Sequence, residues 1–453
     1  MSEIKRIGFG SKLGIILATA GSAVGLGNIW RFPYMAGMNG GAAFILFYLV
    51  FVLMLGVPGM MAEFVVGRSA ESNAAGAYNK LAGKTPWRVI GYLGVITSMI
   101  ILGFYAVVAG WCMQYLLASV IGHVNGNVSY VTHYFQEFSS NPWKPALWAV
   151  SFIGLTHLVV ARGVRNGIEK ASKLLMPTLM ILLVVLIVAS CMLPNAWKGV
   201  VFLFKPDFSK MTHSVLLEAL GQAFFSLSLG TACLCTYASY FTRQTNLMKS
   251  AVQIALLDTV VAVLAGLMIF PAAFSVGVNP DSGPSLIFIT LPNVFHEAFA
   301  AVPVVGYVIA ILFYALLALA ALTSTISMHE IGTAFFHEEF HVSRGRGAWV
   351  VTAICSVIAV LCSLSNGVLA DFKLLGMGLL DFCDSLTAQV LLPLGSLLTC
   401  LFVGWYIPRK VVHDQITNWG TLRGGLLDLF LFFVRFVCPI CIIAIFLHQL
   451  KLI

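Results

Sequence analysis

Long apolar runs follow one another along the whole length of the chain. A membrane-spanning helix needs about 20 apolar residues to cross roughly 30 Å of hydrocarbon, and eleven runs have about this length. They cover residues 12–35, 41–67, 88–121, 146–161, 171–194, 213–241, 247–277, 302–336, 347–364, 379–406 and 425–449. Lipid satisfies no backbone hydrogen bond, and the runs are long and continuous. The pattern therefore predicts eleven transmembrane helices in an all-α polytopic membrane protein.

The composition is that of a chain built for lipid: 59% of its 453 residues are hydrophobic and 10% are charged, whereas soluble domains carry about 25% charged residues. With the N-terminus inside, the inner segments hold eighteen Lys and Arg residues and the outer segments hold seven. This asymmetry predicts a cytoplasmic N-terminus and, with an odd number of spans, an external C-terminus. The net charge of +8 is therefore a sign of topology, and no nucleic-acid partner is expected. The ten cysteines lie mostly in or beside the apolar runs, so we expect packing roles and no disulfide.

Two of the predicted helices are interrupted near their middle. The first contains AGSAVGLGNIWRFPY (20–34), with closely spaced glycines, and the sixth contains GQAFFSLSLGTACLCTYASY (221–240), with serines, a glycine and a threonine. Small residues also let two helices pack closely, which is the alternative for either helix alone. Matching interruptions at the start of two blocks of five helices instead indicate a transporter with its site at mid-membrane. Freed carbonyls would suit a hard cation, and freed amides a carboxylate.

The wider segment AGSAVGLGNIWRFPYMAGMNGGAAF (20–44) resembles the first-helix signature of the neurotransmitter:sodium symporter family. GQAFFSLSLG (221–230) is similar to the family's sixth-helix motif and LTSTIS (322–327) to its eighth, and the resemblance extends over essentially the whole chain. It implies a sodium-coupled symporter, not an enzyme, that works by alternating access in a bacterial-type inner (plasma) membrane. It also implies a 5+5 inverted-repeat fold with helices 1 and 6 unwound at mid-membrane. The implied units are a first repeat at 1–194, a second at 195–406, and an eleventh helix and tail at 407–453.

The resemblance implies two sodium sites made of oxygen atoms, the ligands that suit a hard cation. The first would use Ala23, Asn28, Ser226 and Asp258, together with the carboxylate of the substrate. The second would use Gly21, Val24, Ala320, Thr323 and Ser324. For the two hydroxyl side chains of the second site, hydrogen bonds to carbonyls of their own helix are the alternative.

Asp258 departs from the family pattern, which has asparagine at this position. Many chloride-independent bacterial members carry a glutamate one helical turn later, where this chain has Ala262. Tyr48, Gln222 and Ser226 match the rest of the family's chloride-site pattern. A lone carboxylate in mid-membrane costs roughly 2.5–3.5 kcal/mol, so it should have a cationic partner. We therefore expect Asp258 to face the first sodium ion and to replace the charge of chloride, so that no chloride is required; a protonated aspartate that makes one hydrogen bond is the alternative.

The resemblance also implies that the substrate is an amino acid. The amides of Leu26 and Gly27 and the hydroxyl of Tyr105 would bind its carboxylate, and carbonyls and hydroxyls of the sixth helix would bind its ammonium group. Gly25 stands where monoamine transporters carry an aspartate, which favours an amino acid over an amine. Thr231 stands where the bacterial leucine transporter of this family carries a phenylalanine, so we expect more room and a large hydrophobic or aromatic side chain on the substrate. The complete predicted set is Leu26, Gly27, Ile101, Tyr105, Phe225, Ser226, Ser228, Thr231, Ser324 and Met328.

Charged residues near the helix ends predict two gates. The pairs are Arg31 with Asp384 on the outside, with Asp381 as the rival partner, and Arg6 with Glu338 on the inside, steadied by Tyr240. Anchoring at the membrane surface is the alternative for each pair. Residues 167–177 (GIEKASKLLMP) also resemble the Gly-x9-Pro segment at which bacterial members unwind their fifth helix. A glycine cap followed by a helical proline has the same spacing.

Two other functions stay open as alternatives. Residues 337–341 read HEEFH, the spacing at which two histidines of one helix bind zinc and the glutamate acts as a base in a metalloprotease. This motif lies at the end of a predicted span, has no evident third ligand, and shares Glu338 with the predicted gate. The second alternative is a sodium-dependent amino acid sensor on the same fold, which concentrative uptake would exclude.

Overall fold

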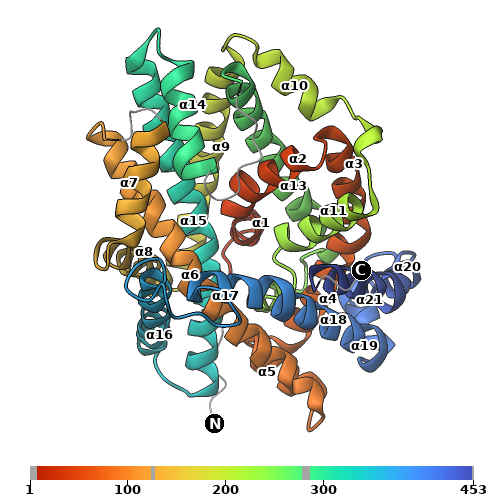
Figure 1. Cartoon of the computed structure of the whole chain (residues 1–453). Helices are drawn as coiled ribbons and strands as arrows, with labels where there is room; N and C mark the ends of the chain where they lie inside the picture. The colour runs from red at the N-terminus through yellow and green to blue at the C-terminus, as the bar shows by residue number, and fades with distance from the viewer. Residues whose placement is uncertain (1–7, 124–127, 278–285, 451–453) are drawn as a thin grey trace.

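A computed structural model of the chain describes residues 8–123, 128–277 and 286–450. Helices account for all of the regular elements in these ranges apart from one isolated bridge between Leu374 and Met377. The all-α architecture predicted from the apolar runs is therefore confirmed (Figure 1).

Most of the predicted spans are continuous helices. Within the described residues, eight helices are long and apolar enough to cross a membrane. They are Ala42–Ala70, Pro86–Val120, Val164–Cys191, Leu247–Ser275, Pro303–Glu339, Arg344–Leu364, Leu379–Tyr406 and Leu427–Gln449. Two bent pairs also pass as spans, which gives up to ten: Lys12–Ala23 with Gly27–Met38, bent by 56°, and Ser129–Ser140 with Lys144–Val160, bent by 73°.

The predicted span 213–241 falls in neither group because its break is longer. Residues 227–232 separate α11 (His213–Ser226) from α12 (Cys233–Ala238). Within this stretch Ser228, Gly230 and Ala232 have positive φ angles of 53°, 82° and 60°, which a right-handed helix does not contain. The interruptions predicted in the first and sixth helices are therefore both present.

Local sequence explains where several helices begin. α1 (Lys12–Ala23) follows Ser11, whose hydroxyl accepts a hydrogen bond from the Gly14 amide at 3.0 Å. α5 (Ala74–Ala82) follows Asn73, whose side chain accepts a backbone N–H of the first turn in the same way. Serine and asparagine favour this position because their side chains satisfy an amide that the helix cannot.

Four long helices pack together on one side of the molecule: α6 (Val89–Val120), α8 (Lys144–Val160), α15 (Pro303–Glu339) and α16 (Arg344–Leu364). The two broken helices lie beside this group near the centre of Figure 1, with α1 and α2 (Phe32–Met38) close to α11 and to α13 (Leu247–Ser275). Because α1 packs against both α15 and α13, its break is surrounded by protein. Backbone groups freed from a helix are tolerated at membrane depth only in such surroundings.

Shorter or peripheral helices complete the molecule. They are α3 (Ala42–Phe51), α4 (Val57–Ala70), α7 (Val128–Ser140), α9 (Lys170–Cys191), α10 (Ala196–Phe204), α14 (Leu291–Ala298), α17 (Leu379–Ser385), α18 (Leu392–Leu401), α19 (Arg409–Ile416), α20 (Leu427–Phe432) and α21 (Cys438–Gln449). π-Helical turns extend several helices, among them η1 (Gly27–Arg31), η4 (Val164–Glu169), η8 (Phe402–Tyr406) and η9 (Phe433–Val437). Arg435 lies in η9, and its Nε donates a hydrogen bond to the Gly404 carbonyl oxygen in η8 at 2.6 Å. This charged residue inside a predicted span thus has a backbone acceptor.

Candidate functional site

The break in the first helix frees the carbonyl oxygen of Val24. It accepts hydrogen bonds from Thr323 Oγ1 at 3.1 Å and from Ser324 Oγ at 3.2 Å, both on α15. Thr323 Oγ1 also donates to the Ala320 carbonyl oxygen of its own helix at 2.8 Å. Gly21 lies alongside, since a Cβ on this residue would be 3.4 Å from Thr323 Cβ. The structure therefore brings together all five residues predicted for the second sodium site.

Gly25 lets the break approach two helices closely. A Cβ on this residue would overlap Ser324 Oγ and would lie 2.9 Å from the Tyr105 hydroxyl. The Gly25 amide donates to Asn28 Oδ1 at 3.0 Å, and the Leu26 amide donates to the Tyr105 hydroxyl at 2.9 Å. Side chains thus satisfy two of the amides at the break.

Asp258, on α13, is fully buried at the centre of a polar cluster. Its carboxylate accepts hydrogen bonds from Ser226 Oγ at 2.6 Å, Asn28 Nδ2 at 2.7 Å and the Tyr48 hydroxyl at 3.3 Å. Three of the four residues predicted for the first sodium site therefore meet here; the fourth, Ala23, is the buried last residue of α1. Gln222, from the same chloride-site pattern, is also buried, and its side-chain amide makes no hydrogen bond within the described residues.

Glu63, on α4, holds the break of the sixth helix and was not predicted from the sequence. This buried carboxylate accepts hydrogen bonds from the amides of Gly230 at 2.8 Å and Cys235 at 3.3 Å. From the α6 side, Ser98 Oγ donates to the Thr231 carbonyl oxygen at 2.6 Å. The sequence did contain a sign of this role, because Glu63 is the single carboxylate within the apolar stretch MMAEFVV. Burying a charge at such a position costs free energy unless the charge has partners.

The predicted substrate residues lie along both breaks and on the helices beside them. Gly27 lies against Phe225, since a Cβ on Gly27 would be 3.3 Å from Phe225 Cε1. Thr231 Oγ1 donates to the Ser228 carbonyl oxygen at 2.8 Å, so this side chain helps to shape the sixth-helix break. The remaining pocket residues are Ile101, buried in α6, and Met328, half-buried in α15.

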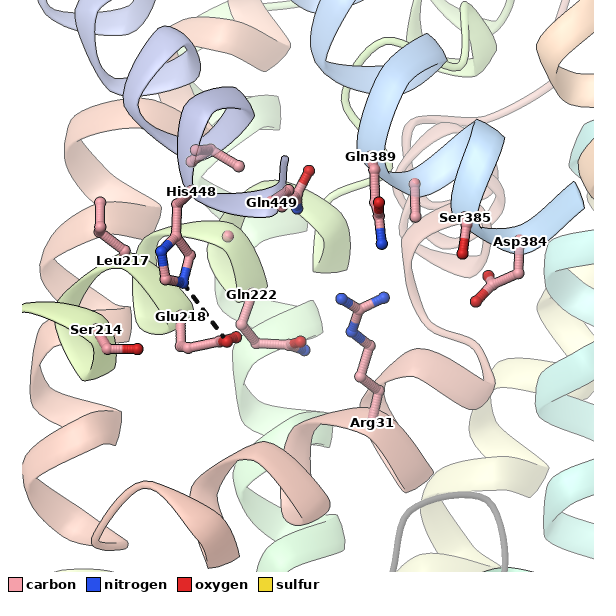
Figure 2. A pocket seen from close by; sticks show the side chains of 13 residues that line it. Arg31, Ser214, Leu217, Glu218, Gln222, Asp384, Ser385, Gln389, His448 and Gln449 are labelled. Carbon is pink, nitrogen blue, oxygen red and sulfur yellow. Dashed lines mark ion pairs between the residues drawn. The ribbon is translucent and has the colours of Figure 1, made fainter. Parts of the chain in front are cut away.

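A cavity of about 360 Å³ lies beside Arg31, at the end of η1. Figure 2 shows Arg31 directed into it from one side and Asp384, on α17, from another. The Arg31 guanidinium lies over the Phe225 ring at 4.1 Å. Within the described chain the cavity separates Arg31 from Asp384 and no direct ion pair joins them, whereas Glu218 and His448 on the opposite wall are 3.7 Å apart.

The predicted inner gate is described only in part, because Arg6 lies outside the described residues. Its expected partner Glu338 accepts hydrogen bonds from the Asn73 amide at 2.8 Å and from Asn73 Nδ2 at 3.0 Å. Glu338 also belongs to HEEFH, but α15 ends at Glu339 and His341 has a φ of 54°, so the two histidines do not share one helix face. The parts of the chain described here contain no group of three or more His, Cys, Asp or Glu that could hold a metal.

A buried ion pair that was not predicted lies near this inner end. The Tyr240 hydroxyl, expected to steady Glu338, donates to Glu330 Oε1 at 2.7 Å. Glu330 is fully buried and pairs with Arg344, whose Nη2 also donates to the Val160 carbonyl oxygen at 3.1 Å. No spacing in the sequence connects Tyr240, in the turn after α12, with Glu330 on α15 and Arg344 on α16, so only the fold reveals this network.

Comparison of the sequence with models of known protein families identifies the family of this chain. The model of the family described as sodium:neurotransmitter symporter matches residues 6–141 and 127–453. The chain belongs to the sodium:neurotransmitter symporter family. This symporter is accordingly an integral membrane protein and a sodium-dependent transporter, and the zinc-protease alternative is set aside.

Relatives and a solved structure agree with this assignment. Over 450 residues the symporter is 38% identical to the sodium-dependent transporter YhdH of Bacillus subtilis, with 99% of this chain and 98% of the relative covered. Over 442 residues it is 31% identical to the sodium-dependent transporter MJ1319 of Methanocaldococcus jannaschii, with 94% and 87% covered. Its structure matches the crystal structure of MhsT in complex with L-phenylalanine with a TM-score of 0.88, at 40% identity, over 98% of this chain and 100% of that chain. The fold implied by the sequence resemblance is therefore confirmed.

Proposed function

We propose that this symporter imports a hydrophobic or aromatic amino acid together with sodium, by alternating access. The observation that carries the proposal is the meeting of both helix breaks at a buried carboxylate. Asn28, just after the first break, and Ser226, at the edge of the second, both hydrogen-bond to Asp258. A carboxylate enclosed in this way in a membrane protein calls for a cation. The similarity to MhsT, whose crystal structure contains L-phenylalanine, supports an amino acid as the second substrate.

The first sodium ion would bind within the Asp258 cluster. Asp258 and Ser226 supply oxygen atoms directly, and Ala23 would supply its carbonyl. Asn28 turns its Nδ2 toward Asp258 and its Oδ1 toward the Gly25 amide, so its amide would rotate to offer the oxygen to the ion. The carboxylate of the substrate would complete the set of hard oxygen ligands.

The second sodium ion would bind where Val24, Thr323 and Ser324 meet. The two hydroxyls already lie within 3.2 Å of the Val24 carbonyl oxygen. An ion placed among these groups would replace the hydrogen bonds with ion–oxygen contacts. The carbonyls of Gly21 and Ala320 would complete the site.

The amino acid would bind between the two breaks. Its carboxylate would take up the amides of Leu26 and Gly27 and the Tyr105 hydroxyl, and its ammonium group the carbonyls near Phe225. The side chain would lie toward Thr231 and the neighbouring hydrophobic residues. Because the carboxylate would also touch the first sodium ion, each would bind weakly without the other, and this reciprocity would couple their transport.

Asp258 would also remove the need for chloride, since its negative charge stands next to Tyr48 and Ser226 where the family's chloride site lies. The proposed orientation has a cytoplasmic N-terminus and an external C-terminus in a bacterial-type inner membrane. The proposed repeats are residues 1–194 and 195–406, followed by the eleventh helix in 407–453.

Thermal unfolding of the purified protein with each of the twenty amino acids, in sodium and again in potassium, tests the proposal. A ligand that binds the folded state raises apparent stability by mass action. We expect stabilisation by a few hydrophobic or aromatic amino acids, in sodium only. No shift with any amino acid in either salt would contradict it. Uptake into proteoliposomes against a gradient then separates the transporter from a sodium-dependent sensor, which would bind but not concentrate the ligand.

A further inference from the structure

Glu169 joins the start of α1 to the start of α9. It is the last residue of η4, and 3% of it is exposed. One of its carboxylate oxygens accepts a hydrogen bond from the Gly10 amide at 2.6 Å, and the other accepts one from Ser11 Oγ at 2.8 Å. Ser11 Oγ in turn accepts from the Gly14 amide at 3.0 Å. Ser11, which caps the first turn of α1, is therefore itself held by a carboxylate that belongs to another helix.

Gly14 provides the space for this carboxylate. A Cβ on Gly14 would overlap Glu169 Oε1 and would lie 2.5 Å from Glu169 Cδ. On the other side of the carboxylate, Lys173 Nζ is 2.6 Å from Oε1, and 39% of the lysine side chain is exposed. Arg165, in η4, lies against the segment before α1, since a Cβ on Gly10 would be 2.7 Å from Arg165 Nε. The negative charge thus pairs with Lys173 and lies at the N-terminal end of α1, the end of a helix that favours an anion.

The contact continues along the two helices toward the proposed second sodium site. Two helical turns beyond Gly14 and Glu169, Gly21 and Met176 meet in the same way: a Cβ on Gly21 would be 3.6 Å from Met176 Sδ. The same Cβ would be 3.4 Å from Thr323 Cβ. α1 and α9 therefore run side by side from the carboxylate to the residues that would hold sodium.

We propose that Glu169 is a clamp that holds the inner end of α1 against α9, and that its release opens the second sodium site to water from the cytoplasm. The inference rests on the proposed function, because it assumes a sodium ion beside Gly21 and an inward N-terminus. Glu169 is a positioning residue, since its contacts are to Gly10, Ser11 and Lys173. When the carboxylate leaves, the Gly10 amide and the Ser11 hydroxyl, directly before α1, lose their shared acceptor and hydrogen-bond to water instead.

Hydrogen–deuterium exchange of the full-length protein tests the clamp. In sodium without amino acid, Glu169→Gln is expected to exchange about tenfold faster than wild type in the segments 8–23 and 164–176, because a strong charge-assisted contact that limits local opening is lost. Lys173→Gln is the matched control: it removes a partner of the same carboxylate but no contact to α1, so exchange in 8–23 should stay at the wild-type rate. Unchanged exchange of 8–23 in Glu169→Gln, or acceleration of the whole chain to the same extent, would overturn the proposal.

A double-mutant cycle separates the clamp from a general packing defect. Gly14→Ala is expected to speed exchange of 8–23 as Glu169→Gln does, because the added methyl group occupies the space of the carboxylate. In Glu169→Ala that space is empty, so adding Gly14→Ala should cause little further acceleration. Additive effects of the two substitutions would contradict a direct contact between these positions.

The sodium titration distinguishes failure of the clamp from failure of the proposed function. If wild type shows no sodium-dependent stabilisation, the proposed sodium site is wrong, whatever Glu169 does. If wild type responds to sodium and Glu169→Gln exchanges as wild type, the site stands and the clamp is wrong. With both correct, Glu169→Gln should need several-fold more sodium for half-maximal stabilisation than wild type and Lys173→Gln.

Discussion

Asp258→Asn removes one buried charge and keeps the size of the side chain. In the structure Ser226 and Asn28 donate to the carboxylate at 2.6 and 2.7 Å. A sodium ion that takes the place of either donor would lie within about 4 Å of the negative charge. Two unit charges at this distance attract by about 4 kcal/mol at an effective dielectric constant of about 20. Since about 1.4 kcal/mol is a factor of ten, and the asparagine dipole keeps part of the attraction, sodium should bind about 10²–10³-fold more weakly.

The assay for Asp258→Asn is a sodium titration of thermal unfolding at a fixed concentration of the stabilising amino acid. Its matched control is Asp371→Asn, an exposed aspartate in the segment between α16 and α17. The control should keep the wild-type midpoint, whereas Asp258→Asn should shift the midpoint upward by the calculated factor. A midpoint within about threefold of wild type would refute the electrostatic argument, because a carboxylate in contact with the ion cannot be replaced at so small a cost.

Three further results are expected. Tyr105→Phe removes a hydroxyl hydrogen bond near the first break, so amino acid titrations should show about tenfold or greater loss of affinity. Sodium alone should still stabilise the variant, and an unchanged affinity for the amino acid would exclude Tyr105 from the site. Arg31→Lys keeps the charge but loses the planar stacking on Phe225, so the rate of uptake should fall more than the equilibrium affinity for the amino acid. An equal loss of uptake rate and affinity would contradict a gating role. The sulfur atoms of Cys362 and Cys383 are 3.9 Å apart, so oxidation with copper phenanthroline should join them in a disulfide that peptide mass spectrometry detects. Cys362→Ser should abolish this disulfide, and its absence from oxidised wild type would contradict the pairing.

The sequence was sufficient for the overall architecture because lipid imposes a simple rule. Apolar length alone located the long spans, and runs such as 379–406 agree with the structure to the residue. The interruption of the sixth helix was also readable, since Ser228 and Gly230 are poor residues for a helix interior. Its extent was not, because the conformation of 227–232 depends on a hydrogen bond that Glu63 accepts from Gly230 and on one that Ser98 donates to Thr231.

The candidate site could be predicted in part through motifs, and the remainder needed the fold. Residues of one motif, such as Thr323 and Ser324, are neighbours in the sequence, and in the structure both donate hydrogen bonds to the Val24 carbonyl oxygen. The contact of Tyr240 with Glu330 has no such signal, because polar groups on different helices find partners only after the helices pack. The orientation of the Asn28 amide likewise depends on Gly25 and Asp258 together.

Glu63 holds the sixth-helix break through main-chain atoms, and this matters for substitutions in the proposed substrate pocket. Its carboxylate accepts hydrogen bonds from the main-chain amides of Gly230 and Cys235, so this support involves no side chain of the break itself. The unwound conformation therefore tolerates new side chains nearby, for example at Phe225, without losing this support. The support of the break and the shape of the proposed substrate pocket therefore rest on different groups: main-chain amides held by a buried acid on α4, and side chains such as Phe225.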